Sequence, residues 1–102
     1  MEYRSLGRTG IKVSKLCLGC LTFGAATEPE DSYDMVDRAI DAGINFLDTA
    51  NQYSLGKSEE VTGEALKRNG KRNRIVLATK VYRVMSEEDP NAAGASRRHI
   101  IE

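Results

Sequence analysis

The sequence lacks a net charge, a long apolar run and an apolar N-terminal region, and each of these absences argues against a class of protein. Fifteen Lys and Arg residues balance fifteen Asp and Glu residues, so the formal net charge is zero. Such a chain has no overall electrostatic attraction to nucleic acid or to an anionic membrane. No stretch reaches the ~18 apolar residues of a transmembrane helix. The polar N-terminus also lacks the apolar region of a secretory signal. We therefore expect a cytoplasmic protein that binds neither nucleic acid nor membrane.

Sulfur and imidazole groups are also scarce. The chain has two cysteines, Cys17 and Cys20, and one histidine, His99, whereas a structural zinc site needs four ligands. The cysteines form a C-x-x-C pattern inside an apolar segment, residues 16–21, which we expect to be a strand. Residues three apart in a strand face opposite sides about 10 Å apart, which is too far for a disulfide. The sequence predicts no metal site and two unpaired thiols without a chemical role.

What is present is an alternation of strands and helices. Residues 1–15 have the pattern of a β-hairpin whose turn contains Gly7 and Gly10. Apolar strands are expected at residues 16–21, 44–48 and 74–81, and the last is apolar enough for burial on both faces. Three helices are expected. The first lies between Thr27 and Gly43, the second at about residues 58–68, and the third begins at Arg97 with Ser96 as its cap. Short connections in this order predict a parallel α/β sheet with right-handed crossovers.

The first of these helices has its own start and stop signals. Thr27 and Glu30 have the spacing of a capping box, Pro29 stands in the first turn, and Gly43 follows the last turn. One face of the helix is apolar, and we expect it to pack on the sheet; it comprises Met35, Val36, Ala39 and Ile40.

Nucleotide-binding loops of the common kinds are absent. The first strand is followed by Gly19 and Gly24, which do not have G-x-G-x-x-G spacing, and Ala25 stands where a P-loop needs lysine.

Residues 67–74 form a basic run that could serve as a nucleic-acid patch. A solvated loop after a helix C-terminus is the favoured interpretation, since cations suit that position.

Three polar side chains stand at one edge of the predicted sheet. Asp48 closes the second parallel strand, Tyr53 lies in the loop after it, and Lys80 lies near the end of the third strand. Sites in parallel sheets assemble at this carboxyl edge. An ammonium beside a phenol favours the phenolate, which would let Tyr53 act as a general acid while Asp48 holds Lys80. The alternative is a strand-end salt bridge with Tyr53 as packing.

Around these residues the sequence resembles the N-terminal part of the aldo-keto reductases. Within that family it is most similar to the bacterial and shaker-β-like branches. The resemblance covers nearly the whole chain, and the matching text is YRSLGRTG at 3–10, LGCLTFG at 18–24, GINFLDTANQY at 43–53, GKSEE at 56–60 and LATK at 77–80. It implies a (β/α)₈ TIM barrel whose bottom is plugged by an N-terminal hairpin. It also implies reduction of aldehydes and ketones with a nicotinamide cofactor, usually NADPH.

The resemblance also implies residue roles. Tyr53 matches the general acid, Lys80 the residue that assists it, and Asp48 the carboxylate that pairs with the lysine and borders the nicotinamide ribose. The first loop, which passes close to NADP(H), matches Gly19, Cys20, Leu21 and Thr22. The family's catalytic histidine follows the fourth strand, and His99 does not match it. We expect His99 to be a surface residue of a helix on the outside of the barrel.

The extent of the chain shapes the expectation. A full barrel has about 250 residues, so 102 residues make about two-fifths of one. We expect a single partial domain, with the hairpin at 1–15 and βα units at 16–102, that is, three strands and two to three helices of an incomplete barrel. Three functions stay open: a carbonyl reductase acting on small molecules, a nicotinamide-binding regulatory subunit of the potassium-channel β type, and an inactive truncated fragment. Self-association or pairing with a missing C-terminal part is expected.

Overall fold

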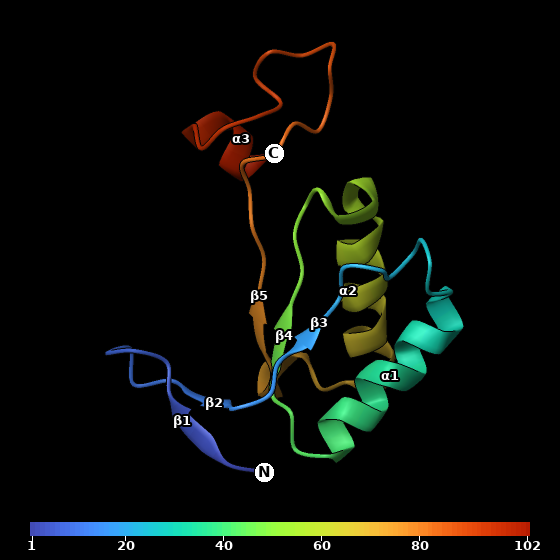
Figure 1. Cartoon of the computed structure of the whole chain (residues 1–102), viewed down its shortest axis with the longest axis vertical. Coiled ribbons are helices and arrows are strands. Elements are labelled where there is room, and N and C mark those ends of the chain that lie inside the picture. The colour runs from blue at the N-terminus through green and yellow to red at the C-terminus, as the bar shows by residue number, and fades with distance from the viewer.

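A computed structural model describes all 102 residues as a hairpin followed by a three-stranded parallel sheet with two helices on one side (Figure 1). The hairpin pairs β1 (Tyr3–Ser5) with β2 (Lys12–Ser14). The sheet has the order β3 (Leu18–Gly19), β4 (Phe46–Asp48) and β5 (Val76–Ala78). The predicted α/β class and parallel pairing are confirmed. The sheet is open at both edges, so no barrel is closed.

The two long helices connect the strands and pack against each other. They are α1 (Pro29–Asp41) and α2 (Lys57–Asn69). Each carries acidic residues in its first turn and basic residues in its last, which suits the helix dipole. Short elements complete the chain: the 3₁₀ turns η1 (Tyr53–Gly56) and η2 (Arg72–Arg74), and the helix α3 (Arg97–Ile101). None of these helices is long and apolar enough to cross a bilayer.

The start of α1 differs from the predicted capping box. Glu28 is the N-cap residue, no side chain caps the helix, and Pro29 occupies its first position. The Thr27 hydroxyl instead shares a 2.7 Å hydrogen bond with the Thr22 hydroxyl, which closes the loop before the helix. Thr27 therefore lies one residue before the N-cap, and its hydroxyl closes the loop rather than capping the helix. At the start of α3 the expected cap is present, because Ser96 Oγ accepts from the His99 backbone N–H.

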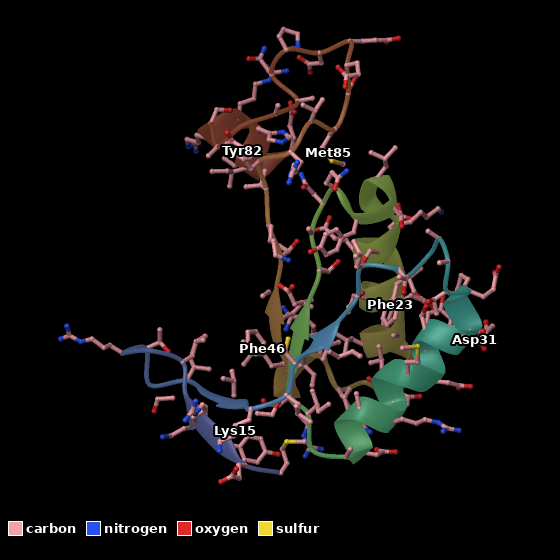
Figure 2. The ribbon with its side chains drawn as sticks, in the orientation of Figure 1. Lys15, Phe23, Asp31, Phe46, Tyr82 and Met85 are labelled. Carbon is pink, nitrogen blue, oxygen red and sulfur yellow. The ribbon has the colours of Figure 1, made fainter.

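The core lies between the sheet and the helix pair. Phe23, Leu47 and Val36 are fully buried, and Figure 2 shows Phe23 beside the helices. Leu47 points from the middle strand into this core, so its neighbours Phe46 and Asp48 point to the opposite, uncovered face. Of the four residues predicted to form the packing face of α1, Met35 is 42% exposed and lies outside the core.

The strands are shorter than predicted. The structure has two residues of strand where 16–21 was expected, and three each in place of 44–48 and 74–81. β5 is also only half-buried rather than covered on both faces, because helices lie on one side of the sheet alone. The ladder nevertheless continues beyond the strand ends: the backbone N–H of Thr49 donates to Ala78 O at 2.9 Å, and that of Asn51 to Lys80 O at 3.1 Å.

The hairpin is attached to the amino end of the sheet through side-chain hydrogen bonds. Asn45, just before β4, accepts from the Ser14 N–H at 2.8 Å and donates to Lys12 O at 3.0 Å. Tyr3 Oη also donates to Gly43 O at 2.7 Å. The hairpin therefore lies at the end of the sheet away from the carboxyl edge, as Figure 1 shows.

Candidate active site

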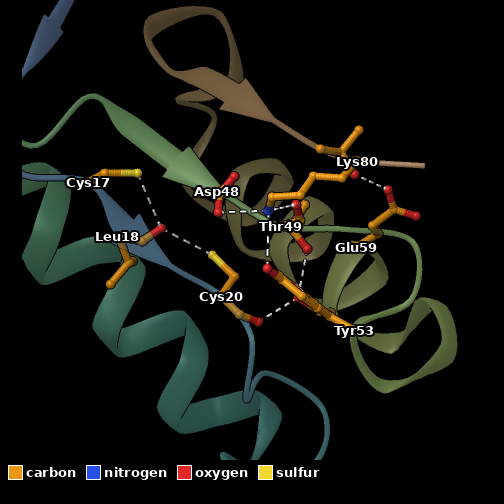
Figure 3. A network of polar contacts seen from close by, with 10 residues as sticks. Cys17, Leu18, Cys20, Asp48, Thr49, Tyr53, Glu59 and Lys80 are labelled. Atoms are coloured by element: carbon orange, nitrogen blue, oxygen red, sulfur yellow. Dashed lines mark hydrogen bonds and ion pairs between the residues drawn. The ribbon is translucent and has the colours of Figure 1, made fainter. Parts of the chain in front are cut away.

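The structure brings the three strand-end residues together (Figure 3). Asp48 is the last residue of β4 and lies in register with Ala78, the last residue of the neighbouring strand β5, so Lys80 follows two residues beyond that point. Lys80 Nζ lies 2.8 Å from Asp48 Oδ2 and donates to it. Tyr53 Oη lies 3.1 Å from the same Nζ. The predicted proximity of these three groups is confirmed.

The ammonium of Lys80 uses all three of its donor directions. Besides Asp48 and Tyr53, it donates to the backbone carbonyl oxygen of Thr49 at 2.9 Å. Nζ also lies 4.8 Å from the centroid of the Tyr53 ring. The hydrogen bond to Asp48 is the main cause that raises the pKa of Lys80 above its ordinary value. Lys80 therefore stays protonated, and it keeps a positive charge beside the phenol oxygen.

Tyr53 is placed by an unusual turn. Its backbone N–H donates to Ala50 O, and the two residues that follow, Ser54 and Leu55, have φ values of +52° and +50°. Non-glycine residues seldom adopt left-handed conformations, and two in succession store strain that the surrounding structure must hold. The turn leads directly into Gly56 and the start of α2. The position of the phenol is thus coupled to the position of that helix.

A buried polar link, which sequence reasoning missed, holds the three loops of the site together. Ser58 in the first turn of α2 donates to Cys20 O at 2.6 Å and shares a 2.7 Å hydrogen bond with Thr49 Oγ1. Both hydroxyl residues are buried. The link therefore joins the loop after β3, the loop after β4 and the helix. The sequence signal was a serine beside a helix start, which alone predicts only a cap.

The first loop has an open side at this edge. Gly19 lies in register with Asp48, and a side chain at Gly19 would meet no atom within 4 Å. Cys20 is fully buried, with its carbonyl held by Ser58, while Leu21 and Thr22 are exposed. The backbone at Gly19 thus borders open space next to Asp48 and Lys80. A carboxylate that can accept from hydroxyl groups and an unobstructed glycine fit the nicotinamide-ribose end of a dinucleotide.

The two cysteines differ in exposure, although both sulfur atoms approach the same carbonyl oxygen, Leu18 O, at 3.9 Å and 3.7 Å. Cys17 is exposed, Cys20 is buried, and both are free thiols. Burial is the main cause that raises the pKa of each thiol. No group of three His, Cys, Asp or Glu side chains in the structure has the geometry to hold a metal ion.

A cavity of about 410 Å³ adjoins Tyr53 and Lys80. Its walls come from the loop after β4 and from the segment that follows β5, whose residues Tyr82 and Met85 are marked in Figure 2. The polar residues among its lining are Asn51, Gln52, Tyr53, Lys80, Tyr82 and Arg83.

The structure also corrects the expectation for His99. It is only 6% exposed, not a surface residue, and its Nε2 atom has no hydrogen-bond partner. The reason is the short length and orientation of α3, whose first turn brings His99 back to the segment after β5. There it lines a second cavity of about 450 Å³ together with Val81 and Met85.

Comparison with known proteins identifies the family. The model of the "Aldo/keto reductase family" matches residues 15–102. The chain belongs to the aldo/keto reductase family. The resemblance to the aldo-keto reductases inferred from the sequence, and the α/β fold that this resemblance implied, are thereby confirmed. The chain forms the N-terminal part of the family's TIM barrel.

Individual relatives of this chain are considerably longer than it is. "Uncharacterized oxidoreductase YrpG" of Bacillus subtilis is 47% identical over 96 residues, covering 89% of this chain and 29% of the relative. A "Probable voltage-gated potassium channel subunit beta" of Oryza sativa subsp. japonica is 38% identical, covering 100% of this chain and 31% of the relative. The solved structure of aldo-keto reductase AKR11C1 from Bacillus halodurans (holo form) superposes with a TM-score of 0.76 at 38% identity. The match covers 88% of this chain and 29% of that structure's chain. The chain thus spans about three-tenths of these relatives.

Proposed function

We propose that this chain carries the proton-donating part of the active site of an NADPH-dependent carbonyl reductase. The observation that supports this most is the contact of one ammonium, Lys80 Nζ, with both Tyr53 Oη at 3.1 Å and Asp48 Oδ2 at 2.8 Å. Membership of an oxidoreductase family supports the reaction type. The proposed substrate is a small aldehyde or ketone.

In this proposal Tyr53 donates its proton to the carbonyl oxygen as negative charge develops there. The Lys80 ammonium stabilises the phenolate that remains, which makes the phenol a stronger acid when it is needed. Asp48 keeps Lys80 charged and fixes its direction. Asp48 and Tyr53 are partly buried, whereas half of the Lys80 side chain is exposed, so water screens the ammonium from the outer side.

NADPH, when bound, would supply the hydride. Asp48 would accept hydrogen bonds from its ribose, and the backbone of the first loop, at Gly19, Cys20, Leu21 and Thr22, would border the nicotinamide end. These residues fit that role because Gly19 has open space beside it and Asp48 keeps one oxygen outside its ion pair. We propose a cytoplasmic location, with no nucleic-acid or membrane partner.

The test uses a completed barrel, defined as residues 1–102 of this chain joined to the part of AKR11C1 from Bacillus halodurans that follows the position equivalent to Glu102. Turnover of NADPH with simple aldehydes is measured by absorbance. The expected result is aldehyde-dependent oxidation of NADPH that is lost on substitution of Tyr53 by Phe. Turnover in the Phe variant equal to that of the parent would contradict the assignment.

A second candidate is a regulatory subunit of the potassium-channel β type. It is favoured by the Oryza sativa relative, which matches the whole of this chain. Both functions are compatible with the same Asp48, Tyr53 and Lys80 arrangement, so the discriminating measurement is association with a voltage-gated potassium channel in parallel with turnover. Channel binding with negligible turnover would favour the regulatory subunit. Turnover without channel binding would favour the reductase, and the absence of both would favour an inactive fragment.

A further inference from the structure

We propose that Arg83 makes this site selective for carbonyl compounds that also carry a carboxylate group. The inference rests on the proposed function, because it names the substrate class of the same site. It begins from the cavity of about 410 Å³ that Tyr53 and Lys80 line, which is large enough for a small organic molecule.

The charge of this cavity has one sign. Lys80 and Arg83 are the charged residues among its lining, and no Asp or Glu lines it. Lys80 is already committed to Asp48, to the Thr49 carbonyl and to Tyr53. Arg83 is therefore the free cation of the cavity, and it stands three residues beyond Lys80 on the segment that continues upward from β5 (Figure 1).

Arg83 has no partner within the chain. It takes part in none of the ion pairs and side-chain hydrogen bonds of the structure, and it is exposed. The acidic residues of the same segment do not neutralise it: Glu87 and Glu88 form no ion pair, and Asp89 Oδ1 accepts instead from the Asn91 N–H at 2.8 Å. A guanidinium left unpaired next to an acidic run is placed for an anion from outside the chain.

The chemistry of the remaining wall suits a carboxylated substrate. The side-chain amides of Asn51 and Gln52 line the same cavity and make no hydrogen bond to the protein. A guanidinium binds a planar carboxylate through two parallel N–H···O bonds, which is a geometry that a lysine cannot offer. Tyr53 and Arg83 line one cavity of about 410 Å³, so a single small molecule with a short carbon skeleton or one ring can present a carbonyl group to Tyr53 and a carboxylate to Arg83.

The experiment compares 4-formylbenzoate with its methyl ester, which has the same reactive aldehyde but no charge. The completed barrel is prepared as parent, Arg83→Gln, Arg83→Lys and the matched control Arg8→Gln, whose arginine lies in the hairpin turn and also has no ion-pair partner. For each protein, kcat and KM are measured with both aldehydes. Binding of 4-formylbenzoate without NADPH is measured separately by ligand-observed NMR.

We expect Arg83→Gln to raise KM for 4-formylbenzoate about tenfold, the size of one charged hydrogen bond of ~1.4 kcal/mol. The kcat for that substrate and both constants for the ester should change less than about twofold. Arg83→Lys should recover part of the affinity, and Arg8→Gln should match the parent. The preference for the charged aldehyde should also shrink between about 0.1 M and about 1 M salt, because the Debye length falls from about 10 Å to about 3 Å.

Equal changes for acid and ester, or no change in Arg83→Gln, would overturn the inference and leave the proposed reductase intact. Failure of the parent to reduce either aldehyde would contradict the proposed function, and the NMR measurement then decides the role of Arg83 alone. Binding that weakens about tenfold in Arg83→Gln would support the carboxylate contact. Binding that is the same in Arg83→Gln and the parent would refute it.

Discussion

Replacing Lys80 by methionine is the sharpest test of the site, because it removes one charge and little volume. The variant loses three hydrogen bonds, to Asp48, to the Thr49 carbonyl and to Tyr53. Neither Asp48 nor Lys80 belongs to the buried core, so the fold should survive the change. We expect turnover of the completed barrel to fall about 100-fold, with the affinity for NADPH changing less than about threefold.

The magnitude follows from the 3.1 Å distance between Lys80 Nζ and Tyr53 Oη. Coulomb's law gives the attraction between an ammonium and a phenolate at that distance as roughly 1 kcal/mol in water and roughly 5 kcal/mol at an effective dielectric constant of 20. A hydrogen bond to a charged group contributes ~1.5–3 kcal/mol, which lies inside that range. At about 1.4 kcal/mol per factor of ten, a contribution of ~2.8 kcal/mol, which lies within both ranges, corresponds to a loss of about 100-fold.

The assay is steady-state oxidation of NADPH at neutral pH, with Lys67→Met as the matched control. Lys67 is exposed on α2 and makes no ion pair. Added methylammonium should restore part of the turnover to Lys80→Ala, whose short side chain leaves room for a small cation beside the phenol, and none to Tyr53→Phe, which has no phenol. Turnover of Lys80→Met within about threefold of the parent would refute the role assigned to the ammonium.

Four further outcomes are expected. Tyr53→Phe in the completed barrel should lose at least ~10²-fold in turnover, the usual contribution of a general acid, while NADPH titration shows near-parental affinity; an affinity loss as large as the turnover loss would indicate a binding role instead. Because the pKa of Lys80 is raised in the folded state, its ion pair should stabilise the fold below pH 10.5, and this stabilisation should decline as the pH rises through the pKa of the folded state. The urea midpoints of the parent and of Lys80→Gln should therefore converge in strong alkali. A difference between the midpoints that does not change with pH would argue against this role. At pH 8 iodoacetamide should label Cys17, more slowly than a free thiol because its pKa is raised, and should label Cys20 only after unfolding; mass spectrometry showing equal rates would contradict the burial. Residues 1–102 alone should show neither catalysis nor tight NADPH binding and should self-associate through the open sheet edges; a monomer in sedimentation with micromolar NADPH affinity would show otherwise.

The element order and the strand-end trio could be predicted because both follow from local rules. Alternating apolar segments with glycine stops predict βα units, and parallel strands bring Asp48 and Lys80 to the same edge whatever the lengths of the strands. Strand lengths were overestimated, because an apolar run such as 74–81 is compatible with burial on both faces, and only the arrangement of the helices decides how much of it is covered.

The wrong predictions concern side chains for which the sequence allows two different sets of contacts. Thr27 was predicted to cap α1, but its hydroxyl forms a hydrogen bond with the Thr22 hydroxyl instead. His99 lies in a five-residue helix, where no periodicity tells which face turns inward. The left-handed turn at Ser54 and Leu55 carries no glycine signal, and the Ser58 link joins segments 38 residues apart. These features depend on tertiary contacts, so one sequence does not reveal them.

The three hydrogen bonds of Lys80 have a consequence for how the site would tolerate its own substrates. A lysine beside an aldehyde readily condenses with it to an imine, but only as the free amine. Here three acceptors hold all the ammonium protons, and the hydrogen bond to Asp48 raises the pKa of Lys80, so the lone pair needed for attack is withheld. The arrangement that assists Tyr53 therefore also protects Lys80 from covalent modification by the compounds that the protein is proposed to reduce.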